Sequence, residues 1–434
     1  MISQNELFSI ISKLNWINTT SNYLILLQKL FLMNVAIIGG GAAGFFSAIH
    51  VKLNFPNAKV TLFEKSNKLL SKVKISGGGR CNVTNACSSI STLSKAYPRG
   101  GKALKKIFPE FYTKHTMEWF EKRGVALLTQ EDQCVFPVSQ NSQTIIDCFL
   151  QEALRLGVEI KTESPVQKLT PKNGQIYLHV NENEISFDYV IVATGGSPKK
   201  SGLIWLENLG HKIENPVPSL FTFNMPDETI RDLMGVVVEE ALVKIKGEKL
   251  EGNGPVLITH WGMSGPAILK LSAFGARILA EKNYNFSIEV NWVNESNHIL
   301  VMDKLEDIIE SHSEKQLQTI RPYYLPTRLW LYLLNRHQLN SMKKWRELSK
   351  KEKNKIVQLL CNDSYQVRGK TTFKEEFVTC GGVSLDSIYI KNMQSKVVPN
   401  LFFTGEVCDI DGLTGGYNFQ AAWTTAFIAA KLGN

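Results

Sequence analysis

The clearest apolar pattern in the chain begins at Asn34. A short apolar strand at 34–38 runs into a glycine-rich turn at 39–44, and the apolar residues of 45–53 then fit one helix. A second apolar strand, 59–63, ends at Glu64. Strand, tight turn, helix and strand in this order are typical of a βαβ unit with parallel strands. The pattern therefore predicts a dinucleotide-binding fold of the α/β class.

The rest of the chain alternates between helical and strand patterns. After Pro198 the apolar positions alternate, as in 236–245 and 286–293, which predicts antiparallel strands. Apolar residues recur at helical spacing from His298 to Leu360. A short apolar run at 401–404 then predicts another strand, and a final helix is expected at 420–432. Other expected elements are helices near 111–123 and 144–156 and strands at 159–161 and 187–193. The predicted domains are an N-terminal extension (1–33), a nucleotide-binding domain in two parts (34–197 and 369–434), an inserted β domain (198–297) and a helical subdomain (298–368).

Composition narrows the class of protein. With 434 residues, 44% of them hydrophobic and 21% charged, the chain is long enough for several domains and has a globular composition. The net charge of +9 is a weak indication of anionic partners. The basic residues look scattered, and runs such as Lys343-Lys344 and Lys350-Lys351 are typical of solvated helix faces. We therefore expect a small-molecule substrate and no nucleic-acid partner.

The cysteines and the N-terminal segment bear on the compartment. Seven cysteines without regular spacing do not form a disulfide framework or a metal site, which favours a reducing cytoplasm and predicts no metal. The apolar segment from Tyr23 to Met33 is short and interrupted by Lys29, so we expect neither a membrane span nor a signal peptide. Met33 lies directly before the first strand, and translation starting there would remove the segment.

The turn at 39–44 carries the first chemical motif, Gly39-x-Gly41-x-x-Gly44. Its glycines permit a tight turn and close approach of a pyrophosphate, while the helix that follows supplies amide donors. Glu64, at the end of the second strand, is placed to accept hydrogen bonds from ribose hydroxyls. Since the motif has both its strand and its acidic residue, dinucleotide binding is a stronger interpretation than a turn without a ligand.

Three further motifs resemble one family. They are Ile-Ser-Gly-Gly-Gly-Arg-Cys-Asn-Val-Thr-Asn at 75–85, Thr-His-Trp-Gly-Met-Ser-Gly-Pro at 259–266, and the segment 404–420, which contains Thr-Gly-Glu and Gly-Gly-Tyr-Asn. Together with the first turn, they resemble the YhiN or BaiN-like bacterial FAD-dependent flavoproteins. The resemblance extends from Asn34 to Asn434 and leaves only the leading segment outside it.

The resemblance implies FAD in a discontinuous, glutathione-reductase-like Rossmann fold, with an inserted antiparallel β domain and a helical subdomain. Glu406 corresponds to the family's ribityl-binding carboxylate, and the glycine-rich stretch ending at Asn418 to the part along the flavin ring. The expected cofactor contacts are Gly39, Gly41, Ala42, Ala43, Gly44, Glu64, Lys65, Ser76, Arg80, Cys81, Asn82, Val166, Ala193, Thr194, Gly195, Gly405, Glu406, Gly416, Tyr417 and Asn418.

Three residues are candidates for catalysis. Cys81 could be a redox-active thiol with a pKa lowered by Arg80, or it could pack in the glycine turn. His260 could be a general acid or a loop histidine bonded to backbone. Tyr417 could protonate a carbanion or stack on the flavin ring.

The reaction stays open between several classes. No second strand, Gly-x-Gly-x-x-Gly and helix unit follows Pro198, so NAD(P)H would have to dock transiently on the flavin. The main hypothesis is an NAD(P)H-driven FAD-dependent oxidoreductase that reduces an activated C=C bond of a small molecule. The alternatives are an amine-type flavin oxidase that uses oxygen, a tRNA-modifying flavoprotein and a non-catalytic FAD-binding scaffold. The oligomeric state does not follow from the sequence.

Overall fold

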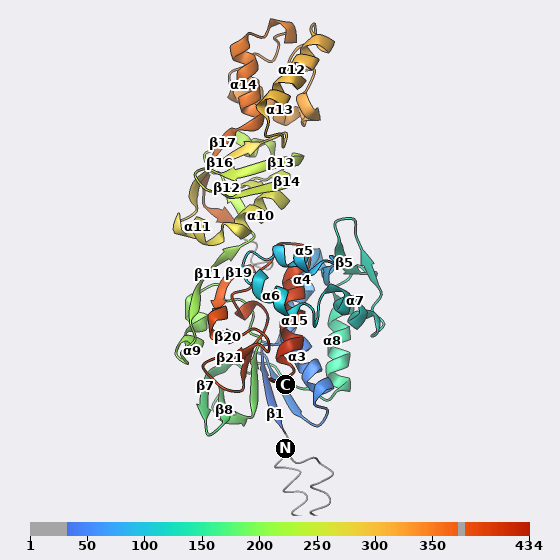
Figure 1. Cartoon of the computed structure of the whole chain (residues 1–434), viewed down its shortest axis with the longest axis vertical. Coiled ribbons are helices and arrows are strands. Elements are labelled where there is room, and N and C mark those ends of the chain that lie inside the picture. The colour runs from blue at the N-terminus through green and yellow to red at the C-terminus, as the bar shows by residue number, and fades with distance from the viewer. Residues whose placement is uncertain (1–32, 372–377) are drawn as a thin grey trace, which may run out of the picture.

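The chain forms two stacked parts joined by a narrow connection (Figure 1). The structure is a computed structural model that describes residues 33–371 and 378–434. The expectations for the N-terminal extension therefore concern residues outside the described ones. None of the described helices has the length and hydropathy needed to cross a membrane.

The lower part is built on a seven-stranded sheet with the strand order β20-β21-β22-β10-β1-β2-β6. Its parallel strands are β1 (Asn34–Ile38), β2 (Lys59–Phe63), β6 (Glu159–Lys161), β10 (Tyr189–Val192) and β22 (Leu401–Phe403). The edge is formed by the antiparallel β20 (Ile388–Tyr389) and β21 (Gln394–Ser395). The central strands are apolar on both faces because helices cover both faces of a parallel sheet. Since β22 comes from the C-terminal segment, this Rossmann-type domain is discontinuous in sequence.

Two helices from opposite ends of the chain lie side by side on this sheet (Figure 1). They are α3 (Ala42–Asn54) and α15 (Tyr417–Ala429). Phe46 of α3 is fully buried, with its ring centroid 4.9 Å from that of Trp119 and 5.2 Å from that of Trp423. The outer layer comprises α4 (Ser71–Gly79), α5 (Ile90–Lys95), α6 (Gly101–Ile107), α7 (Thr113–Glu121) and α8 (Gln143–Arg155), with a small sheet of β3 (Thr84–Asn85), β4 (Leu127–Thr129) and β5 (Cys134–Pro137).

A β-meander precedes β10, where the sequence pattern indicated one strand at 187–193. The structure has β7 (Val166–Lys172), β8 (Gln175–Val180) and β9 (Asn183–Phe187), which form a separate antiparallel sheet. The apolar run is therefore shared: β9 ends at Phe187 and β10 begins at Tyr189. Periodicity alone does not separate two short strands within one apolar run.

The upper part is a second seven-stranded sheet with the order β17-β16-β13-β14-β15-β12-β18, in which all pairs are antiparallel. Its strands are β12 (Thr222–Asn224), β13 (Val237–Ile245), β14 (Glu251–Ile258), β15 (Gly262–Ser264), β16 (Asn285–Asn291), β17 (Asp363–Arg368) and β18 (Lys370–Thr371). Its helices are α10 (Pro266–Phe274), α11 (Ala276–Glu281), α12 (His298–His312), α13 (Thr327–Arg336) and α14 (Lys350–Cys361). The last three lie at the far end from the nucleotide domain (Figure 1).

The two parts have separate hydrophobic cores, and these show where the insertion begins. The second core starts at Phe221 and ends at Val367. Leu203 and Leu206, next to and within α9 (Ile204–Glu207), belong to the first core. The insertion therefore starts near residue 220 rather than at 198, because the change of pattern after Pro198 marks a loop of the nucleotide domain. The connection is a ribbon of β11 (Ile213–Ser219) and β19 (Val378–Val383).

Candidate functional site

The glycine turn after β1 is held against the end of β10. At Gly39, with φ of 114°, a Cβ would lie 2.4 Å from the carbonyl oxygen of Ala193, and at Gly44 it would lie 1.8 Å from the carbonyl oxygen of Gly39. Side chains at these two positions would therefore force the turn and the strand apart. A Cβ at Gly41, in contrast, would meet no described atom within 4 Å. The turn thus packs inward at Gly39 and Gly44 and stays open at Gly41, next to the first residues of α3.

Glu64 is fixed beside this turn by backbone donors. Its Oε2 accepts from the amide of Gly40 at 2.9 Å, and its Oε1 accepts from the amide and the hydroxyl of Ser66 at 2.9 Å. Each carboxylate oxygen has further lone pairs, so the group can still accept from a ligand hydroxyl. The side chain is half-buried, at the end of β2 and beside the turn.

The neighbouring loop leads to Val166, one of the expected cofactor contacts. The carbonyl oxygen of Glu64 accepts from the amide of Ser164 at 2.9 Å, two residues before Val166 at the start of β7. Lys65 and Thr194 are exposed, and Gly195 is half-buried. Their assignment as cofactor contacts stays a prediction from the sequence.

The motif at 75–85 forms a tight loop at the end of α4. Gly77, Gly78, Gly79 and Cys81 all have positive φ, between 57° and 83°. Neither Gly78 nor Gly79 has a described atom within 4 Å of where a Cβ would be, so the loop exposes bare backbone. The amide of Cys81 donates to the carbonyl oxygen of Ser76 at 2.9 Å. The loop therefore presents open amide backbone of the kind that approaches a phosphate or a flavin edge.

Arg80 stabilises the loop from behind. Its Nε donates to the carbonyl oxygen of Gly77 at 3.1 Å, and its guanidinium lies 4.1 Å from the ring centroid of Phe136. A second donor, Nη1, reaches the side chain of Gln140 at 3.3 Å. In the structure Arg80 is thus a support for the loop, with donors remaining on its guanidinium.

Cys81 does not have the reactive environment that the sequence suggested. The side chain is fully buried, and burial raises the pKa of its thiol to about 12, with a hydrogen bond to Ser76 acting weakly in the opposite direction. The expectation of a pKa lowered by Arg80 is therefore wrong, since the guanidinium is engaged with the loop carbonyl and Phe136. Burial removes water from the thiolate, and this raises the pKa of the thiol by more than nearby positive charges lower it.

The C-terminal motif forms the facing wall of the site. Glu406 accepts from Lys72 at 2.5 Å through Oε2 and from the amide of Thr379 at 2.9 Å through Oε1. Gly196 lies close to these groups, because a Cβ at this position would lie 2.4 Å from the hydroxyl oxygen of Thr379 and 2.7 Å from Oε1 of Glu406. Among the described residues the hydroxyl of Thr379 is buried without a hydrogen-bond partner. Lys72 and Thr379 were not identified from the sequence, since only the fold brings them to Glu406.

Two asparagines of the motifs join the walls of the site. Asn418 accepts from the amide of Gly412 at 2.8 Å and donates to the carbonyl oxygen of the same residue at 3.0 Å. Asn82, in the amide orientation that satisfies both of its ends, donates to the carbonyl oxygen of Thr84 at 2.8 Å and accepts from the amide of Gly416 at 3.1 Å. Both side chains therefore shape the loops that surround the site.

The three catalytic candidates lie in different environments. Tyr417 is half-buried on the glycine loop, its ring 6.1 Å from that of Tyr97, and burial raises the pKa of its phenol. His260 is exposed on the insertion, with its ring 4.6 Å from that of Trp261. In the described part of the chain no hydrogen bond or ring contact joins Cys81, His260 and Tyr417. Of the three, only Tyr417 lies on the glycine-rich stretch that ends at Asn418 and is also partly exposed.

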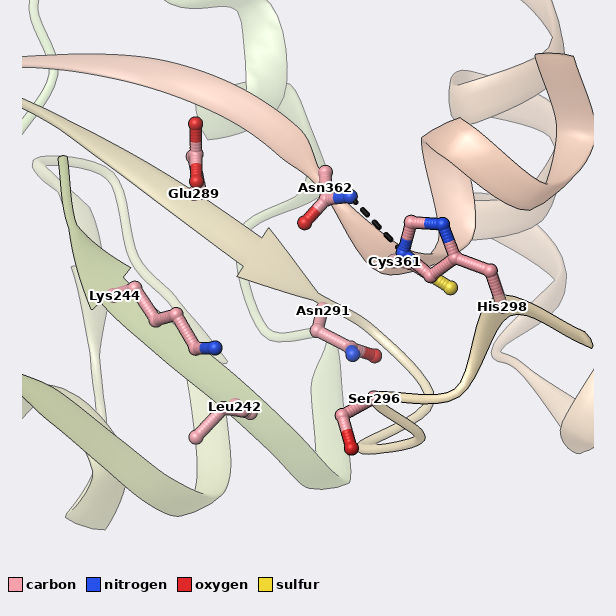
Figure 2. A pocket seen from close by; sticks show the side chains of 8 residues that line it. All are labelled: Leu242, Lys244, Glu289, Asn291, Ser296, His298, Cys361 and Asn362. Atoms are coloured by element: carbon pink, nitrogen blue, oxygen red, sulfur yellow. Dashed lines mark hydrogen bonds between the residues drawn. The ribbon is translucent and has the colours of Figure 1, made fainter.

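A separate cavity of about 160 Å³ lies in the insertion, between its sheet and the helical end (Figure 2). Its lining is polar and includes the pair His298 and Asn362, 3.2 Å apart. The volume is below that of typical ligand pockets, and none of the residues from the sequence motifs lines it. Over the described ranges no three His, Cys, Asp or Glu side chains gather into a group that could hold a metal.

The buried thiol gives a direct chemical test. Under native conditions at pH 8, N-ethylmaleimide should label Cys87, which is half-buried, and leave Cys81 unmodified. A fully buried thiol with a pKa near 12 presents almost no thiolate to the reagent. Peptide mass spectrometry would measure the labelling, with urea-unfolded protein as the control for all seven cysteines. Labelling of Cys81 as fast as Cys87 would contradict the burial.

The chain is similar to known proteins along nearly its whole described length. Residues 33–432 match the family described as HI0933-like protein Rossmann domain. The chain is 24% identical to a 3-dehydro-bile acid delta(4,6)-reductase of Clostridium scindens, over 92% of this chain and 98% of that protein. It is 27% identical to a ribosomal RNA dihydrouridine synthase of Escherichia coli, over 91% of this chain and 96% of that protein.

Among solved structures, 3-ketosteroid delta1-dehydrogenase from Sterolibacterium denitrificans aligns with a TM-score of 0.49 and 12% identity, covering 92% of this chain and 98% of that one. The family match covers nearly the whole described chain, including both halves of the discontinuous sheet and the insertion between them. The chain therefore belongs to the HI0933-like family of flavoprotein oxidoreductases.

Proposed function

We propose that the protein is an FAD-dependent reductase that adds hydrogen across a C=C bond conjugated with a carbonyl group, with NAD(P)H as the electron donor. The observation that carries this proposal is the reaction shared by the two relatives. One relative is named for delta(4,6) double bonds and the other for dihydrouridine. The delta(4,6) double bonds of a 3-oxo steroid and the 5,6 double bond of a uracil ring are both C=C bonds conjugated with a carbonyl group. FAD supplies hydride transfer to such a bond, while the protein orients and protects the reacting atoms.

The residues present fit the cofactor at its phosphate end. The open backbone at Gly41 and the amides of Ala42 and Ala43, at the start of α3, form a site for a pyrophosphate. The bare glycines Gly78 and Gly79 of the second loop supply further unobstructed backbone. Side chains at these positions would fill the space that the ligand needs, which supports a role for all three glycines in close approach.

The carboxylates fit the sugar parts of the cofactor. Glu64 is held by three donors and retains lone pairs for ribose hydroxyls. Glu406 is held by Lys72 and by the amide of Thr379 in the same way. The buried hydroxyl of Thr379 is unsatisfied among the described residues, and a ribityl hydroxyl would give it a partner. We assign Glu64 to the adenosine ribose and Glu406 to the ribityl chain.

The donor would bind without a domain of its own. Every strand pair of the insertion sheet is antiparallel, unlike the parallel sheet of a dinucleotide-binding domain. A nicotinamide would therefore dock transiently in the space later taken by the substrate. This supports alternating binding of the donor and the acceptor at one face of the flavin.

Reduction of a C=C bond also requires a proton on the second carbon. Tyr417 suits this step by its position, because its half-buried phenol lies on the glycine loop of the proposed flavin site. A phenol is protonated at neutral pH, and burial raises the pKa of this one further, so the group can donate a proton but is a weak acid. Cys81 is fully buried, and the exposed His260 belongs to the insertion. We therefore propose Tyr417 as the proton donor.

The glutamate beside the turn provides a test of cofactor binding. Glu64→Ala should weaken FAD retention by roughly tenfold to a hundredfold, since hydrogen bonds to charged groups contribute about 1.5–3 kcal/mol. Glu159→Ala on the neighbouring strand, where the exposed side chain is paired with Lys59 and Lys161, is the matched control. Flavin absorbance after dialysis measures retention. Full stoichiometric flavin in the Glu64 variant would count against the ribose assignment.

The reaction class is tested by separating its two halves. NADH or NADPH, added without oxygen, should bleach the flavin absorbance, and either a conjugated enone or an RNA that contains uridine should restore it. No bleaching by either donor, together with bleaching by an amine, would place the protein among oxidases. If NAD(P)H bleached the flavin but no conjugated acceptor reoxidised it, the proposal would be wrong.

The same assay isolates the proton donor. Tyr417→Phe should leave bleaching by NAD(P)H near the wild-type rate and slow reoxidation by the acceptor by about 100-fold, the lower end for general acids. His260→Gln is the comparison, and it should leave both rates nearly unchanged. An equal loss in both halves for Tyr417→Phe would indicate that the residue only shapes the flavin loop.

A further inference from the structure

One segment of the chain contains all of its excess positive charge. Residues 65–109 include ten lysines and arginines and no aspartate or glutamate. The other residues carry 39 basic and 40 acidic side chains, against 49 and 40 for the whole chain. The net charge of +9 is therefore concentrated between Glu64 and Glu110, and the expectation of scattered basic residues does not hold for this segment.

The acid-free segment borders the proposed flavin site. The amide of Leu413 donates to the carbonyl oxygen of Ala96 at 2.9 Å, and the hydroxyl of Tyr97 donates to the carbonyl oxygen of Tyr417 at 2.7 Å. Arg99 reaches the insertion, where its Nη1 donates to the carbonyl oxygen of Ala273 at 2.5 Å. In Figure 1, α4, α5 and α6 lie at the end of the nucleotide domain that faces the insertion.

Four exposed lysines on α5 and α6 form what we call the lysine face: Lys95, Lys102, Lys105 and Lys106. Helix α6 buries Gly101, Leu104 and Ile107, so its three lysines remain on the outer side at spacings of three and four residues. Within the ranges that the structure describes, none of the four lies within 4.0 Å of a carboxylate. Like charges at these spacings repel one another unless an anion lies between them.

Lysines of the helical subdomain are arranged differently. Lys343 is 2.9 Å from Glu352, Lys344 is 2.8 Å from Glu314, and Lys353 is 2.9 Å from Glu306. There the sequence interpretation of solvated, locally balanced helix faces fits the structure. The unbalanced charge is thus a feature of the flavin-site rim and not of the molecule in general.

We propose that the lysine face binds the phosphate backbone of a folded RNA, one uridine of which is the acceptor at the flavin. The inference rests on the proposed function, because a uracil ring offers the conjugated C=C bond that the reaction requires. A row of unpaired ammonium groups matches a chain of phosphates, each of which is a point of negative charge. A small uncharged enone would make no use of four lysines outside the flavin site. This reverses the expectation that the protein has no nucleic-acid partner.

The test is RNA binding by the oxidised, FAD-loaded protein, which requires no turnover. A fluorescein-labelled RNA stem–loop with uridines in its loop would be titrated at several KCl concentrations, with fluorescence anisotropy as the readout. The variant replaces all four lysines of the face by glutamine. The control replaces four exposed lysines of the helical subdomain, Lys304, Lys315, Lys350 and Lys351, and so changes the net charge equally.

The face variant should bind the RNA at least about tenfold more weakly at moderate salt, and its slope of log affinity against log salt should fall by about 3. The control should stay close to wild type. Equal weakening of both variants would overturn the proposal, as would equally tight binding of a polyglutamate peptide, which would indicate a general polyanion surface.

The outcome is separable from that of the proposed function. Flavin content and reoxidation by a small enone would be measured on the same face variant, and both should match wild type because no lysine of the face contacts Glu64, Glu406 or Tyr417. A protein that reduces conjugated acceptors but never binds RNA would refute the lysine face and leave the reductase proposal standing. A protein that binds RNA but reduces no acceptor would refute the reductase proposal.

Discussion

The fold depends on the return of the chain to its first domain after the insertion. β22 pairs in parallel with β10, with Val190 opposite Leu401 and Val192 opposite Phe403. On the sheet surface α15 lies against α3, and Trp423 of α15 closes the aromatic cluster around Phe46. Parallel strands bury both faces and both edges, so β10 would be left with an open apolar edge without this segment. The insertion must therefore enter and leave at neighbouring points, which the β11 and β19 ribbon provides.

The same return assembles the proposed site from two distant stretches of sequence. The loop at 75–85 meets the loop at 405–418 through Asn82 and Gly416, and below them Thr84 donates to Gln420 at 2.6 Å. Arg99 adds a buried ion pair with Asp411, which also accepts from Ser219 at the end of β11 at 2.8 Å. Removing one partner of such a pair leaves an uncompensated buried charge, at a cost of about 3–5 kcal/mol. The position of the glycine loop and the direction of the insertion are thus tied to one another.

What the sequence could predict follows from the range of the interactions involved. The strand, turn and helix at 34–54, the acidic end of β2 and helices such as α8 and α13 are specified by local periodicity and glycine chemistry. Local periodicity does not specify the start of the insertion, because the residues after Pro198 join the first core through contacts with residues that are distant in sequence. The pKa of Cys81 depends likewise on burial by distant segments, and the roles of Lys72 and Thr379 appear only beside Glu406. The charge of 65–109, in contrast, is a local property that is hidden in a whole-chain total.

A flavin site selects a type of bond, while other surfaces select the molecule that carries it. The two relatives are named for substrates as different as a bile acid and ribosomal RNA, yet both align with more than nine tenths of this chain. Neither relative therefore has a large extra domain that this chain lacks, and the proposed function assigns the choice of substrate to the surfaces around the flavin site. In this protein the surfaces next to the proposed site are the insertion, where the exposed Trp261 lies beside His260, and the acid-free segment of the nucleotide domain. The two surfaces meet at Arg99. Binding of a substrate large enough to contact both would therefore depend on the position of the insertion relative to the nucleotide domain.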